Sequence, residues 1–287
     1  MSQSLPEWFK QKIPRAGETA GIESLLSGLK LHTVCAGAHC PNIGLCFSHG
    51  TATFMIMGEI CTRNCTFCAV NKGVPTPLDP EEPEHITEAV SRLGLGYVVI
   101  TCVTRDDLVD GGAGHFAATV EALHSQMPEL KVEVLVSDFR GSIESVRTVV
   151  AAGPDVFSHN LETVPRLYSE VRPMADYHRS LDVLKMAKEL RPSIITKSGV
   201  MLGLGESQAE VVGVMRDLRQ AGCDLLTLGQ YLAPSASHHP VARFVTPEEF
   251  TEYEHIGCEE GFKGIASAPL VRSSFKASEL YEKALSV

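Results

Sequence analysis

The feature that most constrains the fold of this chain is a repeated alternation of short apolar runs with helical patterns after about residue 50. The apolar runs are short and bounded by Gly, Pro or polar residues, as buried parallel strands are. Strands are expected at Ala52–Met57, Tyr97–Val103, Lys131–Val136, Asp155–Ser158, Ile194–Val200, Leu225–Leu228 and Phe262–Ala266. The alternation predicts an α/β fold, a partial (β/α)6 TIM-type barrel, and leaves a doubly wound open sheet as the alternative.

Three of the intervening segments carry helix-start signals. The segments Asp79–Glu82 and Thr246–Glu249 each place a capping side chain before a proline, with a carboxylate three residues on. Ser207 and Glu210 form a third capping box. Each signal predicts that a helix begins directly after its capping residue.

The length of 287 residues and the hydrophobic content of 44% allow one large core. Residues 1–50 are rich in Gly and Cys and are expected to form an N-terminal extension. The barrel is expected over 51–266, and a C-terminal extension over 267–287.

The net charge and the N-terminal sequence indicate which macromolecular partners and which cellular location to expect. A net charge of −10 argues against a general nucleic-acid or anionic-membrane binder, which needs a basic face. No secretory signal is visible, and no apolar run approaches the 18 residues of a membrane span. A cytoplasmic protein without nucleic-acid or membrane partners is expected.

Six of the nine cysteines lie within 34 residues, as two triplets. Clustered cysteines in a chain without a signal peptide indicate metal ligation rather than disulfides. Cys61-x₃-Cys65-x₂-Cys68 follows the first predicted strand and offers three thiolates. Iron–sulfur clusters normally take four cysteines, so a triplet leaves one iron open to another ligand. The alternative is that Cys65 and Cys68 form half of a zinc site, which would need a second Cys/His pair.

The second triplet, with Phe67 before its last cysteine, resembles the signature of the radical S-adenosylmethionine (SAM) superfamily. The resemblance implies a 4Fe–4S cluster whose open iron is chelated by the amino and carboxylate groups of SAM. It implies that one electron cleaves the sulfonium bond and that the 5′-deoxyadenosyl radical abstracts hydrogen from an unactivated carbon. Phe67 is a candidate cofactor contact.

Cys35-x₄-Cys40-x₅-Cys46 is a rarer pattern, and its surroundings resemble the lipoyl synthase family. The resemblance runs from Pro6 to about Ala277. It is carried by Thr33–Cys35, Cys40–Cys46, Gly50–Phe54, Arg105–Ala113, His159–Val164, Thr196–Gly199, Gly203–Glu206, Gly229–Leu232 and Val271–Ser274.

This second resemblance implies insertion of two sulfur atoms, at carbons 6 and 8 of a protein-bound octanoyl-lysine, with two SAM molecules consumed. It implies a second, auxiliary 4Fe–4S cluster as the sulfur source, held by Cys35, Cys40, Cys46 and a serine after Arg272, for which Ser274 is favoured. A serine oxygen is a harder donor than thiolate and a poorer match for iron in a sulfide cluster. We hypothesise that this iron detaches readily.

Several polar residues near predicted strand ends are candidate SAM contacts. Asn160 and Glu162 lie at alternate positions past a strand end and can face one side, where they would meet the ribose. Thr101, Arg172 and Lys197 are weaker candidates for the amino group, carboxylate or ribose, since a salt bridge or strand-end cap explains each of them too.

Arg272 is expected to position the serine segment or to meet the substrate. The expected protein partners are octanoylated carriers, namely lipoyl domains of 2-oxoacid dehydrogenases and the glycine cleavage H protein. A reductant such as ferredoxin or flavodoxin and an iron–sulfur carrier for cluster rebuilding are also implied.

The sequence departs from the family pattern around the proposed auxiliary cluster, at Ala36-Gly37, Leu45, Phe47 and Phe275. These positions leave the ligands intact and bear on the preferred partner and on the rate of the sulfur step.

Other functions remain as alternatives. Biotin synthase and the methylthiotransferases share the second triplet, but the former uses other ligands for its auxiliary cluster and the latter carry flanking domains. A ferredoxin-like electron carrier would supply four cysteines per cluster in a shorter chain. A structural zinc protein is the last alternative.

Overall fold

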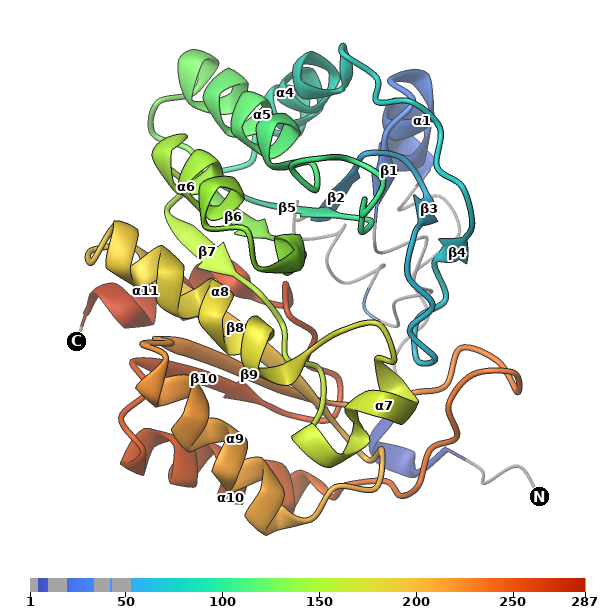
Figure 1. Cartoon of the computed structure of the whole chain (residues 1–287), viewed down its shortest axis with the longest axis vertical. Coiled ribbons are helices and arrows are strands. Elements are labelled where there is room, and N and C mark those ends of the chain that lie inside the picture. The colour runs from blue at the N-terminus through green and yellow to red at the C-terminus, as the bar shows by residue number, and fades with distance from the viewer. Residues whose placement is uncertain (1–4, 10–19, 34–41, 43–52, 287) are drawn as a thin grey trace.

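The computed structural model describes residues 5–9, 20–33, 42 and 53–286 (Figure 1). Their main sheet has the order β1-β2-β5-β6-β7-β8-β9-β10. Its strands are β1 (His32–Thr33), β2 (Thr53–Ile56), β5 (Tyr97–Cys102), β6 (Lys131–Leu135), β7 (Val156–Ser158), β8 (Ile195–Leu202), β9 (Leu225–Gln230) and β10 (Gly264–Ser267). β1 pairs antiparallel with β2, and all later neighbours are parallel.

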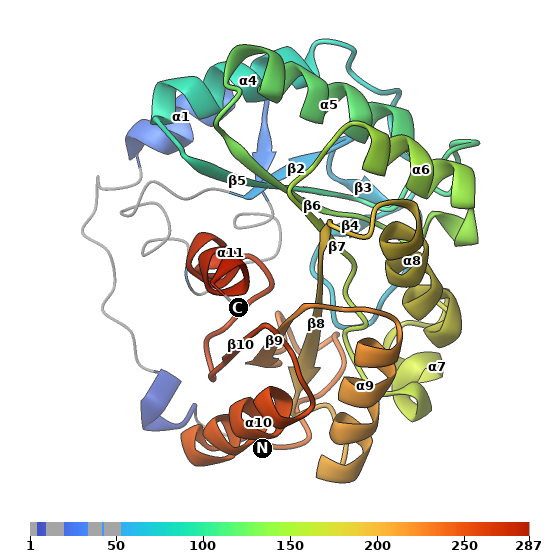
Figure 2. The same ribbon diagram turned by 90° about the vertical axis from the view of Figure 1, so that its left-hand side faces the viewer.

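The helices that connect the parallel strands lie on the outer side of the curved sheet (Figure 2). In the described residues, the helices between strands are α4 (Glu82–Leu93), α5 (Ala113–Gln126), α6 (Ile143–Ala151), α7 (Tyr168–Val171), α8 (Tyr177–Leu190), α9 (Gln208–Gln220) and α10 (Pro247–Glu259). Helix α1 (Ala20–Gly28) precedes β1, and α11 (Ala277–Leu285) follows β10. The short 3₁₀ turns within the described ranges are η1 (Glu7–Phe9), η2 (Phe139–Gly141) and η3 (Pro165–Leu167).

The spatial order of the parallel strands equals their order in the sequence, so the sheet winds in one direction. A doubly wound sheet would reverse its strand order at a switch point. The predicted partial (β/α)6 TIM-type barrel is therefore confirmed, and all seven predicted strands are present with ends shifted by up to two residues. The proposed boundaries of the N- and C-terminal extensions stay predictions.

Two of the three helix-start predictions are confirmed. Ser207 and Thr246 each cap a helix through a complete capping box. The prediction at Asp79 is wrong, because α4 begins at Glu82 and the Asp79 carboxylate accepts from the Glu81 amide at 2.9 Å, before the helix starts. Glu82 turns into the interior, where its Oε2 accepts from the Met57 amide at 2.8 Å and lies 2.6 Å from His115 Nε2.

Helix α11 closes the amino-terminal end of the barrel. Leu280 and Tyr281 on α11 belong to a buried cluster with Val156, Ile195 and Leu225, the first residues of β7, β8 and β9. Full burial of such a side chain contributes about 1.5–3 kcal/mol. The opposite end, where the carboxyl ends of parallel strands place functional groups in such folds, stays available for a site.

None of the helices in the described ranges has the length and apolar content needed to cross a membrane.

Candidate active site

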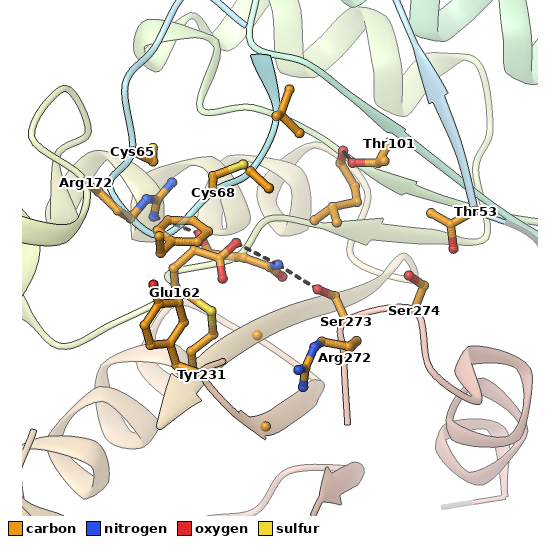
Figure 3. A pocket seen from close by; sticks show the side chains of 18 of the residues that line it. Thr53, Cys65, Cys68, Thr101, Glu162, Arg172, Tyr231, Arg272, Ser273 and Ser274 are labelled. Atoms are coloured by element: carbon orange, nitrogen blue, oxygen red, sulfur yellow. Dashed lines mark hydrogen bonds between the residues drawn. The ribbon is translucent and has the colours of Figure 1, made fainter. Parts of the chain in front are cut away.

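A cavity of about 530 Å³ lies inside the barrel, at the carboxyl ends of the strands (Figure 3). Side chains from β2, β5, β6, β8 and β9 form its walls, together with residues 61–72, here called the cysteine loop, and residues 271–275. The predicted site residues that line it are Cys61, Cys65, Phe67, Cys68, Thr101, Asn160, Glu162, Arg172, Arg272 and Ser274. Segments far apart in the sequence thus meet at one cavity.

The cysteine loop is closed at its base by a short parallel ladder. β3 (Ile60–Cys61) pairs with β4 (Asn71–Lys72), and the Gly73 amide donates to the Cys61 carbonyl at 3.1 Å. Within the loop, the Cys68 amide donates to the Cys65 carbonyl at 3.4 Å. Because both ends of the loop are held, its three thiols face the same cavity.

Burial disfavours ionisation of two of these thiols, Cys65 and Cys68. It raises the pKa of Cys65, which the positive charge of Arg172 opposes, and it raises the pKa of Cys68 to about 11. Thiolates at this site therefore need a positive partner, which metal ions provide as they displace the protons.

Within the described ranges, no three His, Cys, Asp or Glu side chains converge on the position of a single ion. A cubane does not require such convergence, since each of its thiolate ligands binds a different iron.

Arg63 in the cysteine loop ties that loop to two other loops. Its guanidinium donates to both carboxylate oxygens of Asp106, at 2.7 and 2.9 Å, and to both of Asp138, at 2.9 and 2.5 Å. Burial opposes ionisation of Asp138, but Arg63 lowers its pKa to about 2. The arginine thereby fixes the cysteine loop against the loops that follow β5 and β6.

The segment after β7 forms the opposite wall of the cavity. Asn160 Nδ2 donates to Glu162 Oε1 at 3.0 Å and to Ser273 Oγ at 2.8 Å (Figure 3). Arg172 Nη1 donates to the carbonyls of Asn160 and Leu161, both at 2.9 Å. Burial raises the pKa of Glu162. As expected from their spacing, Asn160 and Glu162 both reach the cavity.

Three polar atoms on this wall are buried and have no hydrogen-bond partner among the described residues: His159 Nε2, Asn160 Oδ1 and Arg172 Nε. Such atoms are costly unless a ligand or water satisfies them. His159 Nδ1 lies 2.8 Å from the Val136 carbonyl, which can only accept, so Nδ1 carries the hydrogen. Burial lowers the pKa of His159 to about 4, so its free Nε2 is an acceptor at neutral pH. Two acceptors and one donor suit a polar ligand such as SAM.

The two remaining SAM candidates differ in their positions. Thr101 lines the cavity, and its Oγ1 donates to the Leu135 carbonyl at 3.1 Å. Lys197 is not among the lining residues. Its Nζ is buried deeper in the barrel, 2.9 Å from both carboxylate oxygens of Glu133. The structure does not bring Lys197 to the other candidates, and the salt bridge explains its burial.

The Arg272–Ser274 segment reaches the cavity because β9 allows a close approach. A Cβ at Gly229 would lie 2.0 Å from the Val271 carbonyl oxygen, which only glycine permits. Ser273 is held by Asn160, while Ser274 lines the cavity nearby (Figure 3).

Cys35, Cys40 and Cys46 lie outside the described residues, as do Ala36-Gly37, Leu45 and Phe47. Asn42, between the last two cysteines, is described: it is 1% exposed, lines the cavity and donates to the Leu270 carbonyl at 2.6 Å. Asn42 thus lies beside the residues that lead into the Arg272–Ser274 segment.

Sequence reasoning did not assign roles to Arg63, His159 or Tyr231, all of which line the cavity. The partners of Arg63 lie 43 and 75 residues away, and the Tyr231 hydroxyl bonds a backbone carbonyl, that of His239; no local sequence pattern reveals either contact. His159 directly precedes Asn160 at the end of β7, and this position is the signal that could have marked it.

Comparison with known proteins identifies the class. Residues 55–218 match the Radical SAM superfamily, and the chain belongs to it. Among solved structures, methylornithine synthase (PylB) aligns with a TM-score of 0.51 at 14% identity, over 92% of this chain and 67% of that one. SuiB of Streptococcus suis bound to S-adenosylmethionine aligns with 0.57 at 12% identity, over 75% and 50%. At such identities the likeness concerns the fold.

Relatives that are similar in sequence identify the family within this superfamily. A lipoyl synthase of Caldanaerobacter subterraneus subsp. tengcongensis is 59% identical over 96% of this chain and 97% of its own length. A lipoyl synthase of Rubrobacter xylanophilus is 53% identical over 97% and 87%. The chain therefore belongs to the lipoyl synthase family of radical SAM sulfur-inserting enzymes.

Proposed function

We propose that this chain inserts two sulfur atoms, at carbons 6 and 8 of an octanoyl chain linked to a lysine of a carrier protein. The observation that carries the proposal is the meeting of three segments at one cavity: the cysteine loop, the Asn160–Glu162 wall and the Arg272–Ser274 segment. An enzyme that joins a radical to a sulfur source must align both with one carbon, and a shared cavity serves that end.

The residues at the cysteine loop fit the 4Fe–4S cluster and SAM that the superfamily implies. Cys61, Cys65 and Cys68 would supply thiolates, and the unpartnered atoms on the opposite wall would bind polar groups of SAM. When bound, these groups supply the radical that takes hydrogen from the octanoyl chain. The protein orients the ligands and keeps water from them.

For the second cluster, Cys35, Cys40, Cys46 and Ser274 remain the proposed ligands, with sulfur taken from that cluster. The support is indirect: Asn42, which lies between Cys40 and Cys46 in the sequence, donates to the Leu270 carbonyl, and Ser273 accepts from Asn160 while Ser274 lines the same cavity. Arg272, whose Nη1 donates to the Val271 carbonyl at 2.7 Å, would steady this segment.

Carrier proteins with an octanoyl-lysine, a low-potential reductant such as ferredoxin or flavodoxin, and an iron–sulfur carrier are the proposed partners. The carrier must deliver its lipid into the cavity, where Met55, Leu135 and Val200 provide apolar surface. Mostly apolar walls with a few polar groups are typical of sites for such ligands.

The test is an anaerobic single turnover with an octanoyl-lysine peptide, SAM and dithionite. The protein is first reconstituted to about eight irons per chain, which corresponds to roughly two cubanes. Mass spectrometry should show peptide that gains one and then two sulfurs, together with 5′-deoxyadenosine. Deoxyadenosine without any sulfur gain would reject the substrate while keeping the radical chemistry.

A further inference from the structure

The loop between β9 and α10, residues 231–246, contacts the cysteine loop. Figure 1 shows this β9–α10 loop in orange beside the tip of the cysteine loop. The contact is specific, because the His239 amide donates to the Thr66 carbonyl at 2.9 Å. Thr66 lies between Cys65 and Cys68, so this bond acts on the segment that carries two of the thiols.

The far side of the same threonine is held by α7. Its Oγ1 donates to the Glu170 carbonyl at 2.9 Å, and its amide donates to the Val171 carbonyl at 3.0 Å. Thr66 is therefore bonded to α7 on one side and to the β9–α10 loop on the other.

Tyr231 fixes the β9–α10 loop at the point where it meets Thr66. Its hydroxyl donates to the His239 carbonyl at 2.7 Å, and its ring packs edge-on against the His239 ring with centroids 6.3 Å apart. Tyr231 is 2% exposed and lines the cavity. The same peptide segment of His239 thus receives the tyrosine hydroxyl and gives its amide to Thr66.

Farther along, a buried amide anchors the rest of this loop. Gln230 Oε1 accepts from the Val245 amide at 2.8 Å, and its Nε2 donates to the Arg243 carbonyl at 3.0 Å. The loop is consequently fixed at both ends, and the Tyr231 hydroxyl bonds its middle at the His239 carbonyl.

We propose that Tyr231 is a positioning residue for the cysteine loop, acting through the backbone of His239 on Thr66. The proposal rests on the proposed function only in taking Cys65 and Cys68 as cluster ligands. His239 takes part through its backbone amide and carbonyl, not through its imidazole.

Tyr231→Phe tests the proposal, because it keeps the ring and removes only the hydroxyl. Tyr177→Phe is the matched control, since it removes a hydroxyl bond of the same 2.7 Å length, to Asp217, at a residue that does not line the cavity. The first readout is hydrogen exchange of residues 61–72 in the iron-free protein, which needs neither cluster nor activity. The second is the rate of iron loss to a chelator after reconstitution.

One net hydrogen bond changes a local opening equilibrium by about two- to tenfold. Y231F should raise exchange in residues 61–72 and iron loss by that factor, while Y177F leaves both unchanged. Unchanged exchange in Y231F, or an equal rise in both variants, would overturn the positioning role. Since the exchange is measured without substrate, failure of the sulfur reaction alone would leave this result standing.

His239→Pro gives a second measurement if Y231F does not fold. It removes the His239 amide that donates to the Thr66 carbonyl and should raise exchange over the same residues. An H239P protein whose cysteine loop exchanges as in the wild type would show that the contact from His239 to Thr66 does not position it, which overturns the proposal.

Discussion

Replacement of Arg63 by methionine should destabilise the iron-free protein strongly, although Arg63 belongs to a loop. The guanidinium is 5% exposed, and of its two partners Asp138 is fully buried while Asp106 is 21% exposed. Arg63→Met keeps much of the aliphatic side chain and removes all four hydrogen bonds. Asp138 then retains the Arg140 amide at 3.0 Å and Arg179 at 3.5 Å.

The expected loss of unfolding free energy arises because the Asp138 carboxylate stays buried without its main partner. Removal of one partner of a buried ion pair costs about 3–5 kcal/mol, because the other charge stays buried without compensation. Since Arg179 remains near Asp138, we expect the lower end, about 3 kcal/mol. The free energy of unfolding, from anaerobic urea titration of the iron-free protein with a reductant present, measures this loss. Arg63→Met combined with Asp138→Asn should recover part of it.

Arg166→Met is the control. Arg166 contacts Glu210 through two bonds of 2.7 and 3.1 Å, a geometry similar to that of Arg63, but its side chain is 57% exposed. Exposed ion pairs contribute little to stability. If R63M lost no more stability than R166M, the reasoning that burial makes the Arg63 contacts strong would be refuted.

Three further outcomes are expected. Ser274→Cys should keep about eight irons per chain but slow sulfur transfer in single turnover by about tenfold, or ~1.4 kcal/mol; full turnover with both clusters retained would contradict the proposed lability. Lys197→Met should cost about 3–5 kcal/mol in urea unfolding, because Glu133 stays buried, and Glu133→Gln in the same chain should restore part of it. Burial opposes ionisation of Asp224, but Lys188 lowers its pKa. The stability that the ionised Asp224 carboxylate contributes is therefore present above about pH 4 and is lost as pH falls further. The difference in unfolding free energy between wild type and Asp224→Asn should therefore shrink below that pH.

Local sequence signals predicted the strands and two helix starts, because each depends on a few neighbouring residues. The same signal failed at Asp79, where Glu82 lies in the interior against the Met57 amide and His115 instead of capping a helix. A carboxylate three residues after a capping residue has two possible partners, the backbone of its own helix or a buried group elsewhere. Only the tertiary structure decides between them.

Candidate site residues were predictable where the end of a strand could be located. Asn160 and Glu162 follow β7 directly and reach the cavity. Lys197 is the third residue of β8, which continues to Leu202. Its depth within the barrel keeps it from the cavity, so the type of residue alone could not assign it. The partners of Arg63 lie 43 and 75 residues away and left no local trace.

The cysteine loop is held by protein contacts that do not involve its thiols. The β3–β4 ladder closes the base of the loop, and Arg63 binds the carboxylates of Asp106 and Asp138. Thr66 is hydrogen-bonded to α7 and to the β9–α10 loop. Each contact restricts the loop before a cluster binds, so less conformational entropy is lost on binding. Burial meanwhile raises the pKa of Cys65 and of Cys68, so the bare site disfavours thiolates. The backbone is thus arranged before iron binds, whereas the charge on the ligands depends on the metal.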